Sequence, residues 1–154
     1  MLALVLMVAA GPTASDDFHG WARFSRDQML RGVSDTVEVA TRGVEPGRRD
    51  LHVVMRLTRR GLRQTEVLWA DSTTCPAVRA TVRAMSDLSM PRVASPLERG
   101  SGIRMLDGIG YEFDGPTNWM NGRITLSSNI QTPLSGWVDA RLAALAPCWK
   151  PAKS

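Results

Sequence analysis

The chain has two cysteines, and both lie at the boundary of an expected helix, which constrains the fold more than any other feature. Cys75 precedes Pro76, and proline is well tolerated at the first position of a helix, where its missing N–H is not needed. Cys148 follows Pro147, which cannot continue a second expected helix. A disulfide between Cys75 and Cys148 would join the start of one helix to the end of the other. We therefore expect two roughly antiparallel helices on one face of an antiparallel sheet, an α+β fold with one disulfide.

The spacing of apolar residues predicts the two helices themselves. A helix over residues 76–88 carries one apolar stripe at steps of four, three and three residues. The stripe is Val78, Val82, Met85 and Leu88. A second helix over residues 133–146 opens with Thr132-Pro133, which repeats the arrangement of a cap residue followed by proline. Its apolar stripe is Leu134, Trp137, Val138, Leu142 and Leu145.

Alternation of apolar and polar residues predicts the strands. They are residues 35–42, 51–57 and 64–70 before the first helix, and about 103–106, 109–114 and 123–129 between the helices. Asp107-Gly108 and Asn121-Gly122 favour tight hairpins, because both central positions of such turns need a positive φ. Residues 16–34 fit either a short strand or a helical turn. The predicted order of elements is β-β-β-α-β-β-β-α.

The N-terminal residues predict export. An apolar run of about nine residues is too short to span a bilayer, which needs roughly 20, and small residues suited to cleavage follow it. We expect residues 1–15 to be a signal peptide and residues 16–154 to be a single α+β domain. Because no Lys or Arg precedes the run, a start further upstream and a buried N-terminal strand stay open as alternatives. The even cysteine count also suits a periplasmic or extracellular protein, although two unrelated buried thiols are the alternative.

A basic hairpin is the most unusual local feature. The formal net charge is +4, and the turn between strands 51–57 and 64–70 is rich in arginine. These arginines are Arg56, Arg59, Arg60 and Arg63. They suggest a contact with an anionic partner such as lipid head groups, acidic polysaccharide or an acidic protein, whereas the alternative is a charged tip that keeps the hairpin soluble. Trp119, beside the Asn121-Gly122 turn, is a second candidate contact residue, unless it packs over the sheet edge.

No catalytic residue is predicted. His52, which we expect opposite Trp69 in the hairpin, is the only tempting base, and neither a nucleophile elbow nor a phosphate-binding glycine loop accompanies it. Asp107 and Asp114 are explained by turns at Asp107-Gly108 and Gly115-Pro116. No cofactor is expected, and no metal either, because His19 and His52 lack ligand spacing with the cysteines.

The predicted function is a non-enzymatic binding or inhibitor-like module for a protein or an anionic component of the cell envelope. A small hydrolase with an unrecognised site and a structural accessory subunit are the alternatives. A transmembrane helix is not expected, and neither is a nucleic-acid partner, because export would remove the chain from the cytosol.

Overall fold

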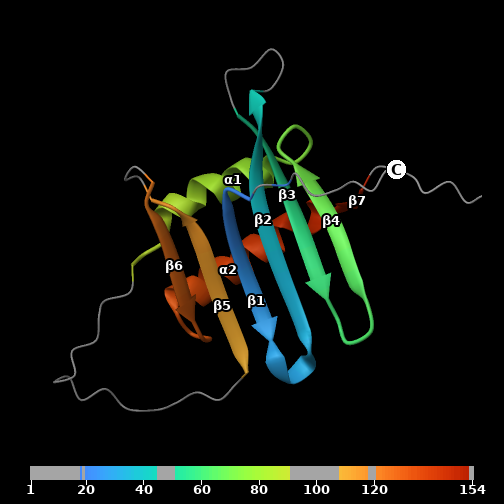
Figure 1. Ribbon diagram of the computed structural model, residues 1–154, viewed down its shortest axis with the longest axis vertical. Helices are drawn as coiled ribbons and strands as arrows, with labels where there is room; N and C mark the ends of the chain where they lie inside the picture. The colour runs from blue at the N-terminus through green and yellow to red at the C-terminus, as the bar shows by residue number, and fades with distance from the viewer. Residues whose placement is uncertain (1–17, 19, 45–50, 91–107, 118–120, 153–154) are drawn as a thin grey trace, which may run out of the picture.

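The computed structural model describes residues 18, 20–44, 51–90, 108–117 and 121–152 (Figure 1). The described strands form one seven-stranded sheet in the order β6-β5-β1-β2-β3-β4-β7, and each pairing is antiparallel. The strands are β1 (Ala22–Gln28), β2 (Val33–Val44), β3 (Leu51–Arg60), β4 (Thr65–Asp71), β5 (Ile109–Pro116), β6 (Arg123–Ser128) and β7 (Lys150–Pro151). The helices are α1 (Pro76–Ala84) and α2 (Pro133–Leu145). Short 3-10 turns are η1 (Met29–Arg31), η2 (Met85–Asp87) and η3 (Ala146–Cys148).

The predicted α+β class, antiparallel sheet, paired helices and disulfide are confirmed, but the predicted order of elements is wrong. The described order is β-β-β-β-α-β-β-α-β. The additional first strand, β1, and the turn η1 both lie within residues 16–34, a segment whose sequence fits either a short strand or a helical turn. The expected strand at 103–106 lies outside the described residues.

The weak signal of β1 has a simple cause. Its side chains on the buried side of the sheet are Ala22, Phe24 and Arg26, so the apolar alternation stops after two residues. The strand forms because it is central: it pairs with β2 on one side and with β5 on the other. Its partners in β5 are far from it in the sequence, and local alternation cannot predict that pairing.

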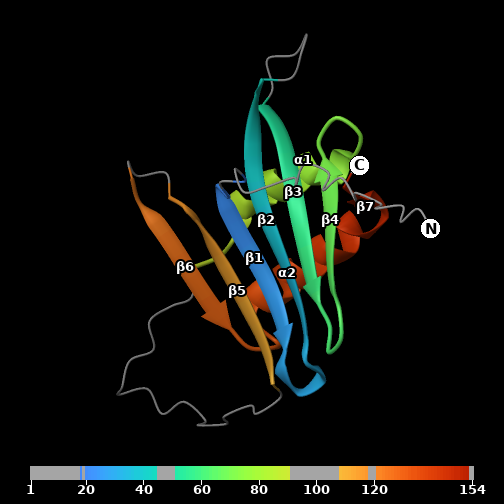
Figure 2. The ribbon, with the colours of Figure 1, turned by 45° about the vertical axis from the view of Figure 1, so that its right-hand side comes forward.

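One face of the sheet is covered by both helices, as the two views of the ribbon agree (Figure 1, Figure 2). This covered face holds the core, and its central side chains are fully buried. They include Phe24, Val37, Val39, Met55 and Leu57 from the sheet, with Val78, Val138 and Leu145 from the helices. Burying each such side chain stabilises the fold by about 1.5–3 kcal/mol relative to leaving it exposed. The opposite face of the sheet, called the open face below, carries no helix among the described residues.

The ends of the helices follow their sequence signals closely. Thr132 caps α2 through a reciprocal pair of hydrogen bonds, in which Ser135 N donates to Thr132 Oγ1 and Thr132 N donates to Ser135 Oγ. Cys75 occupies the cap position of α1 without a side-chain capping bond. The helix α1 ends at Ala84, four residues earlier than predicted, because the chain tightens there into the 3-10 turn η2.

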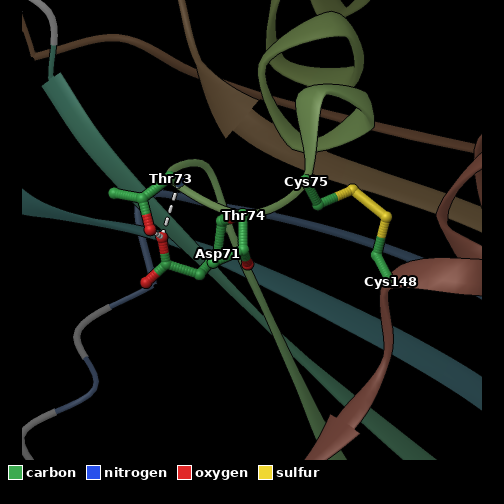
Figure 3. Close-up of a disulfide and its surroundings, with 5 residues drawn as sticks. All are labelled: Asp71, Thr73, Thr74, Cys75 and Cys148. Carbon is green, nitrogen blue, oxygen red and sulfur yellow. Dashed lines mark hydrogen bonds between the residues drawn. A yellow bond between two sulfur atoms is a disulfide. The ribbon is translucent and has the colours of Figure 1, made fainter.

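The predicted disulfide joins Cys75 to Cys148, with the two Cα atoms 5.8 Å apart, and it brings the start of α1 to the end of the α2 segment (Figure 3). A second link between the helices is the indole of Trp137, whose Nε1 donates to the carbonyl oxygen of Ala84 at 2.9 Å. The same ring packs edge-on against Phe24 and Phe113. The helices are therefore tied to each other and to the sheet.

Candidate functional site

The four arginines of the predicted basic hairpin do not share one surface. Side chains alternate between the faces of a strand, so Arg56 and Arg59, three residues apart in β3, point to opposite faces. Arg56 lies on the open face, pairs with Glu38 at 2.7 Å and stacks on the ring of Phe18. Arg59 lies on the covered face and pairs with Asp35 at 2.8 Å. Arg59, Arg60 and Arg63 are all exposed, but in the described chain only Arg60 and Arg63 lack an ion-pair partner among these four arginines.

Arg60 and Arg63 belong to a larger feature, which we call the basic–apolar tip. It is formed by the turn between β1 and β2 and the turn between β3 and β4, which lie at the same end of the sheet (Figure 1). Its apolar residues are strongly exposed: Met29 by 69%, Leu30 by 82% and Leu62 by 84%. Its exposed cationic residues are Arg31, Arg60 and Arg63.

Close packing between the turns holds the tip together. Gly32 closes η1 at a φ of 58°, and a Cβ atom there would lie 2.5 Å from Leu62 Cδ2, so the missing side chain admits Leu62. Leu30 packs in the same way over Gly108, where an added Cβ would lie 2.7 Å from Leu30 Cγ. The backbone N–H of Met29 donates to the carbonyl oxygen of Gly108 at 2.7 Å.

Sequence reasoning missed the apolar half of this tip, although a signal was present. Met29-Leu30-Arg31-Gly32 and Arg60-Gly61-Leu62-Arg63 both place leucine beside arginine and glycine in a turn. Turns are usually built from Gly, Pro, Asn, Asp and Ser. Leucine beside arginine in two separate turns is therefore the pattern in the sequence that indicates the tip. The second candidate contact residue, Trp119, lies outside the described residues.

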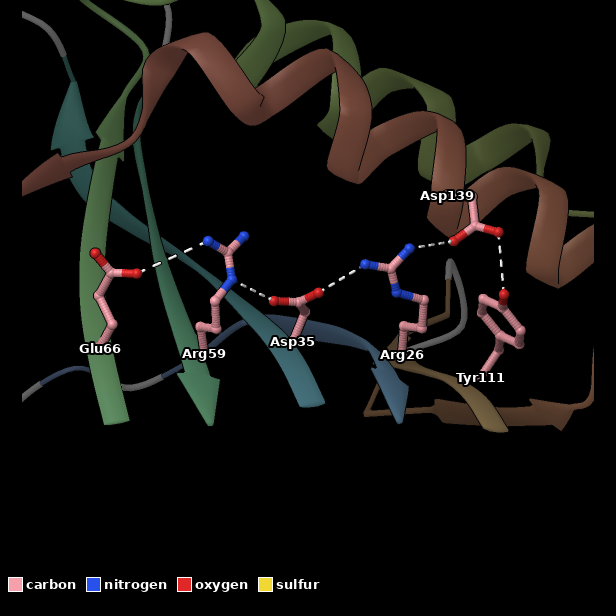
Figure 4. Close-up of polar contacts among 6 residues, drawn as sticks. All are labelled: Arg26, Asp35, Arg59, Glu66, Tyr111 and Asp139. Carbon is pink, nitrogen blue, oxygen red and sulfur yellow. Dashed lines mark hydrogen bonds and ion pairs between the residues drawn. The ribbon is translucent and has the colours of Figure 1, made fainter. Parts of the chain in front are cut away.

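A row of polar side chains crosses the covered face just below the tip, and we call it the Asp35 row (Figure 4). Its members are direct neighbours on five adjacent strands. In sheet order they are Tyr111, Arg26, Asp35, Arg59 and Glu66. Asp139 of α2 lies above the row.

Asp35 is the centre of the row, and its side chain is only 5% exposed. Arg26 Nη2 donates to Asp35 Oδ2 and Arg59 Nε donates to Asp35 Oδ1, each at 2.8 Å. Arg26 also donates to Asp139 Oδ1 at 3.1 Å, whereas Arg59 Nη1 lies 3.7 Å from Glu66 Oε2. The carboxylate of Asp35 is thus held by both of its oxygens.

The row shifts the titration of two of its groups. Burial lowers the pKa of Arg26, but the hydrogen bonds and charges of Asp35 and Asp139 outweigh it and leave that pKa above its ordinary value. Burial raises the pKa of Tyr111, and the hydrogen bond that its hydroxyl donates to Asp139 at 3.0 Å raises it further. Arg26 stays charged and Tyr111 stays neutral at physiological pH.

A pocket of about 450 Å³ lies between this row and α2. The row supplies its polar floor through Arg26, Asp35 and Arg59. Asp139 stands at its rim, and its other walls are apolar or aromatic: Leu68, Leu142, Ala143, Ala146 and Trp149. The sequence pointed to Arg59 but not to the pocket, because the pocket requires the register of four strands and the position of α2.

His52 has a carboxylate partner but not a catalytic arrangement. Its Nε2 lies 2.7 Å from Asp71 Oδ2, and Asp71 Oδ1 accepts hydrogen bonds from the hydroxyl and the N–H of Thr73 (Figure 3). Burial raises the pKa of Asp71, but the bonds from Thr73 and His52 outweigh it and hold that pKa below its ordinary value. Nucleophilic catalysis needs the histidine between hydroxyl and carboxylate, whereas here the carboxylate is in the middle.

Two expectations about neighbouring residues are wrong. The residue opposite Trp69 is Arg56 and not His52, because β3 continues to Arg60 and pairs there with Thr65, which shifts the register of the hairpin by four residues from the expected one. Asp114 lies within β5 rather than at a turn, because Gly115 and Pro116 continue the strand beside β6. Arg123 donates a hydrogen bond to Asp114 and thereby lowers its pKa. Asp107 and His19 lie outside the described residues.

In the described ranges, no three His, Cys, Asp or Glu side chains are grouped so that they could bind a metal ion. Nor does any helix in these ranges have the length and hydrophobicity needed to cross a membrane. Comparisons with protein-family models, curated proteins and solved structures found no match.

Proposed function

We propose that this chain is an exported, non-enzymatic binding protein that attaches to an anionic membrane surface through its basic–apolar tip. The observation that carries the proposal is the exposure of Met29, Leu30 and Leu62 among three arginines at one end of the sheet. Contiguous exposed apolar side chains mark contact sites, and basic residues beside them favour an anionic surface over a neutral one.

The energies of the tip suit reversible attachment. Each arginine near an anionic lipid surface contributes about 1 kcal/mol, so Arg31, Arg60 and Arg63 together contribute about 3 kcal/mol. The apolar side chains add roughly 25 cal/mol for each Å² that enters the apolar part of the bilayer. Asp27 is exposed at the same end of β1 and subtracts part of the electrostatic gain. With these contributions, attachment to the membrane should be reversible and should weaken as the salt concentration rises.

Export is supported by the disulfide between Cys75 and Cys148, because such bonds persist in oxidising compartments. A non-enzymatic role is supported by the arrangement around His52, in which Asp71 separates the imidazole from the hydroxyl of Thr73. The proposed location is accordingly the periplasm or the extracellular space. The anionic lipid head group is the member of the predicted partner classes that the mixture of leucine and arginine fits best.

The test is co-sedimentation of the purified full chain with phosphatidylcholine vesicles that contain or lack phosphatidylglycerol. The variant R31Q/R60Q/R63Q should lose about 3 kcal/mol, or about two orders of magnitude, of partition onto the anionic vesicles. The matched control R42Q/R83Q/K150Q removes the same charge from exposed residues outside the tip and should lose far less. Equal losses in the two triple variants would show that net charge alone drives the attachment and would overturn the assignment to the tip.

A second variant separates the apolar contribution. L30A/L62A should lower the partition by about tenfold, because each substitution removes apolar surface at roughly 25 cal/mol per Å² from the inserted part. Both side chains are more than four-fifths exposed in the free protein, so the substitutions should cost little stability beyond the contacts with Gly32 and Gly108, and urea unfolding measures that cost. If wild-type protein bound neither vesicle but formed a stable complex with an envelope protein, the tip would be the contact of an inhibitor-like module or accessory subunit, and the lipid proposal would be wrong.

A further inference from the structure

We propose that the pocket between the Asp35 row and α2 binds a small carboxylic acid with an apolar body, and that the acid's carboxylate binds Arg59. This site is separate from the tip and does not depend on the proposed membrane attachment. Pockets for small ligands are concave, mainly apolar and equipped with a few polar groups that orient the ligand. The pocket's volume of about 450 Å³ lies in the range of such sites, about 300–1,000 Å³.

Arg59 is the group in the pocket with capacity left for an anion. Its Nε is used by Asp35, but its nearest further carboxylate, Glu66, is 3.7 Å away, which is too long for a good hydrogen bond. Its side chain is 49% exposed, and Figure 4 shows its guanidinium directed away from the sheet, on the side where α2 lies. Arginine presents a planar fork of N–H groups that matches a carboxylate.

The other charged side chains that line the pocket already have ion-pair partners, and the Nε of Arg26, which has no hydrogen-bond partner in the described chain, is buried. Both oxygens of Asp35 accept from guanidinium groups, and the two oxygens of Asp139 accept from Arg26 and from the hydroxyl of Tyr111. Glu66 is the exception, because it is loosely paired and its side chain is 49% exposed. An incoming carboxylate would therefore displace Glu66 from Arg59 rather than break the buried contacts.

The walls of the pocket select the rest of the ligand. Leu68 from β4, Leu142 and Ala143 from α2 and Ala146 from η3 offer apolar contact, and Trp149 adds an aromatic surface. A ligand that had only a carboxylate would leave these walls wet, and a ligand that had only an apolar chain would leave Arg59 without an anion. The site should therefore require both parts in one molecule.

The probe is octanoate, titrated into the purified full chain by isothermal titration calorimetry, with the indole resonance of Trp149 followed by NMR. Octanoate should bind and shift that resonance, whereas acetate, which lacks the apolar chain, and octanol, which lacks the carboxylate, should bind at least about tenfold more weakly. Equal binding of octanol and octanoate would overturn the role of Arg59. The absence of octanoate binding would overturn the proposal for this class of ligand.

Four variants locate the site. Arg59→Gln should weaken octanoate binding about tenfold or more, because it removes a charge-assisted hydrogen bond. Arg83→Gln is the matched control, since this exposed arginine of α1 belongs neither to the pocket nor to the tip, and it should bind as wild type does. Glu66→Gln should strengthen binding about two- to fivefold, because it removes the competing carboxylate. If Glu66→Gln weakened binding instead, the displacement of Glu66 would be refuted.

Ala143→Phe tests whether a loss of octanoate binding can occur while the protein stays folded. It leaves the Asp35 row untouched and fills the pocket from α2, where Ala143 is exposed, so the fold should persist while octanoate binding is lost. Thermal unfolding of each variant checks that the fold is intact. Retention of wild-type affinity in folded Ala143→Phe would place the ligand elsewhere and overturn the proposal, whereas the vesicle assay of the tip would be unaffected by this variant.

Discussion

Removal of the disulfide should cost this fold a large part of its stability. The bond closes a loop between residues 73 positions apart, and the loss of chain entropy in the unfolded state stabilises the native state by about 4 kcal/mol at 25 °C. The two Cα atoms are 5.8 Å apart, within the ordinary range for disulfides. The bond therefore forms without a displacement of the backbone that would reduce this stabilisation. The total free energy of unfolding of a domain is only about 5–15 kcal/mol.

The measurement is urea unfolding of oxidised wild type, C75A, C148A and the double variant C75A/C148A. The three variants are unfolded in the presence of a reductant. Each single variant already breaks the bond, so all three should lose about 4 kcal/mol, which moves the urea midpoint by about 2 M for a slope near 2 kcal/mol/M. Cys75 is buried, so its replacement should add about 1 kcal/mol for lost packing, whereas Cys148 is only half-buried.

The double variant distinguishes a cross-link from packing. If the bond is the source of the stability, C75A/C148A should lose about as much as C75A alone, because the cross-link can be removed only once. Reduced wild-type protein should unfold near the midpoint of C148A. Losses in the single variants that simply add in the double variant would refute the reasoning, as would a reduced wild type that is as stable as the oxidised protein.

Two further predictions come from single buried groups. Tyr111 is the only tyrosine, so absorbance at 295 nm should report a midpoint above its ordinary pKa of about 10, and Asp139→Asn should lower that midpoint. Because the folded-state pKa is raised, the stability from Tyr111 is present below pH about 10 and is lost as pH rises through the folded-state pKa; a native midpoint at or below 10 would contradict this. Thr81 is fully buried on α1, and its hydroxyl has no hydrogen-bond partner in the described chain. Thr81→Val should therefore stabilise the protein by about 1 kcal/mol in urea unfolding, whereas a loss of stability would show that the hydroxyl is satisfied.

The helices and the disulfide were predictable because their signals are local. Proline after a cap residue fixes the start of each helix, as Cys75-Pro76 and Thr132-Pro133 do, and the apolar stripe gives the buried side. With those boundaries known, the bridge to Cys148 required only that the helices run in opposite directions. The end of α1 was less predictable, since residues 85–87 keep the apolar spacing while their backbone tightens into a 3-10 turn.

The strand segments were also predictable, but the pairing of the strands was not. The alternation around residues 51–57 and 35–42 assigns each side chain to one of two faces. Which residue lies opposite which depends on contacts between distant parts of the chain, as the central position of β1 between β2 and β5 illustrates. Both candidate sites depend on such contacts, because the tip is built from two turns and the pocket from four strands and the α2 segment.

The sequence by itself indicated two proline-opened helices, a set of alternating strands and a bridge between Cys75 and Cys148, with two unrelated buried thiols as the alternative to the bridge. The period of two also placed Arg56 on the face opposite Leu57, whereas Arg59 was expected in the turn, and only the longer strand β3 assigns it to the covered face. Only the tertiary structure decided that Asp35 lies beside Arg59, since a register shift of one residue would turn the whole row to the other face. The physical reason is that helix ends and side-chain alternation depend on near neighbours, whereas the tip and the pocket depend on long-range pairing.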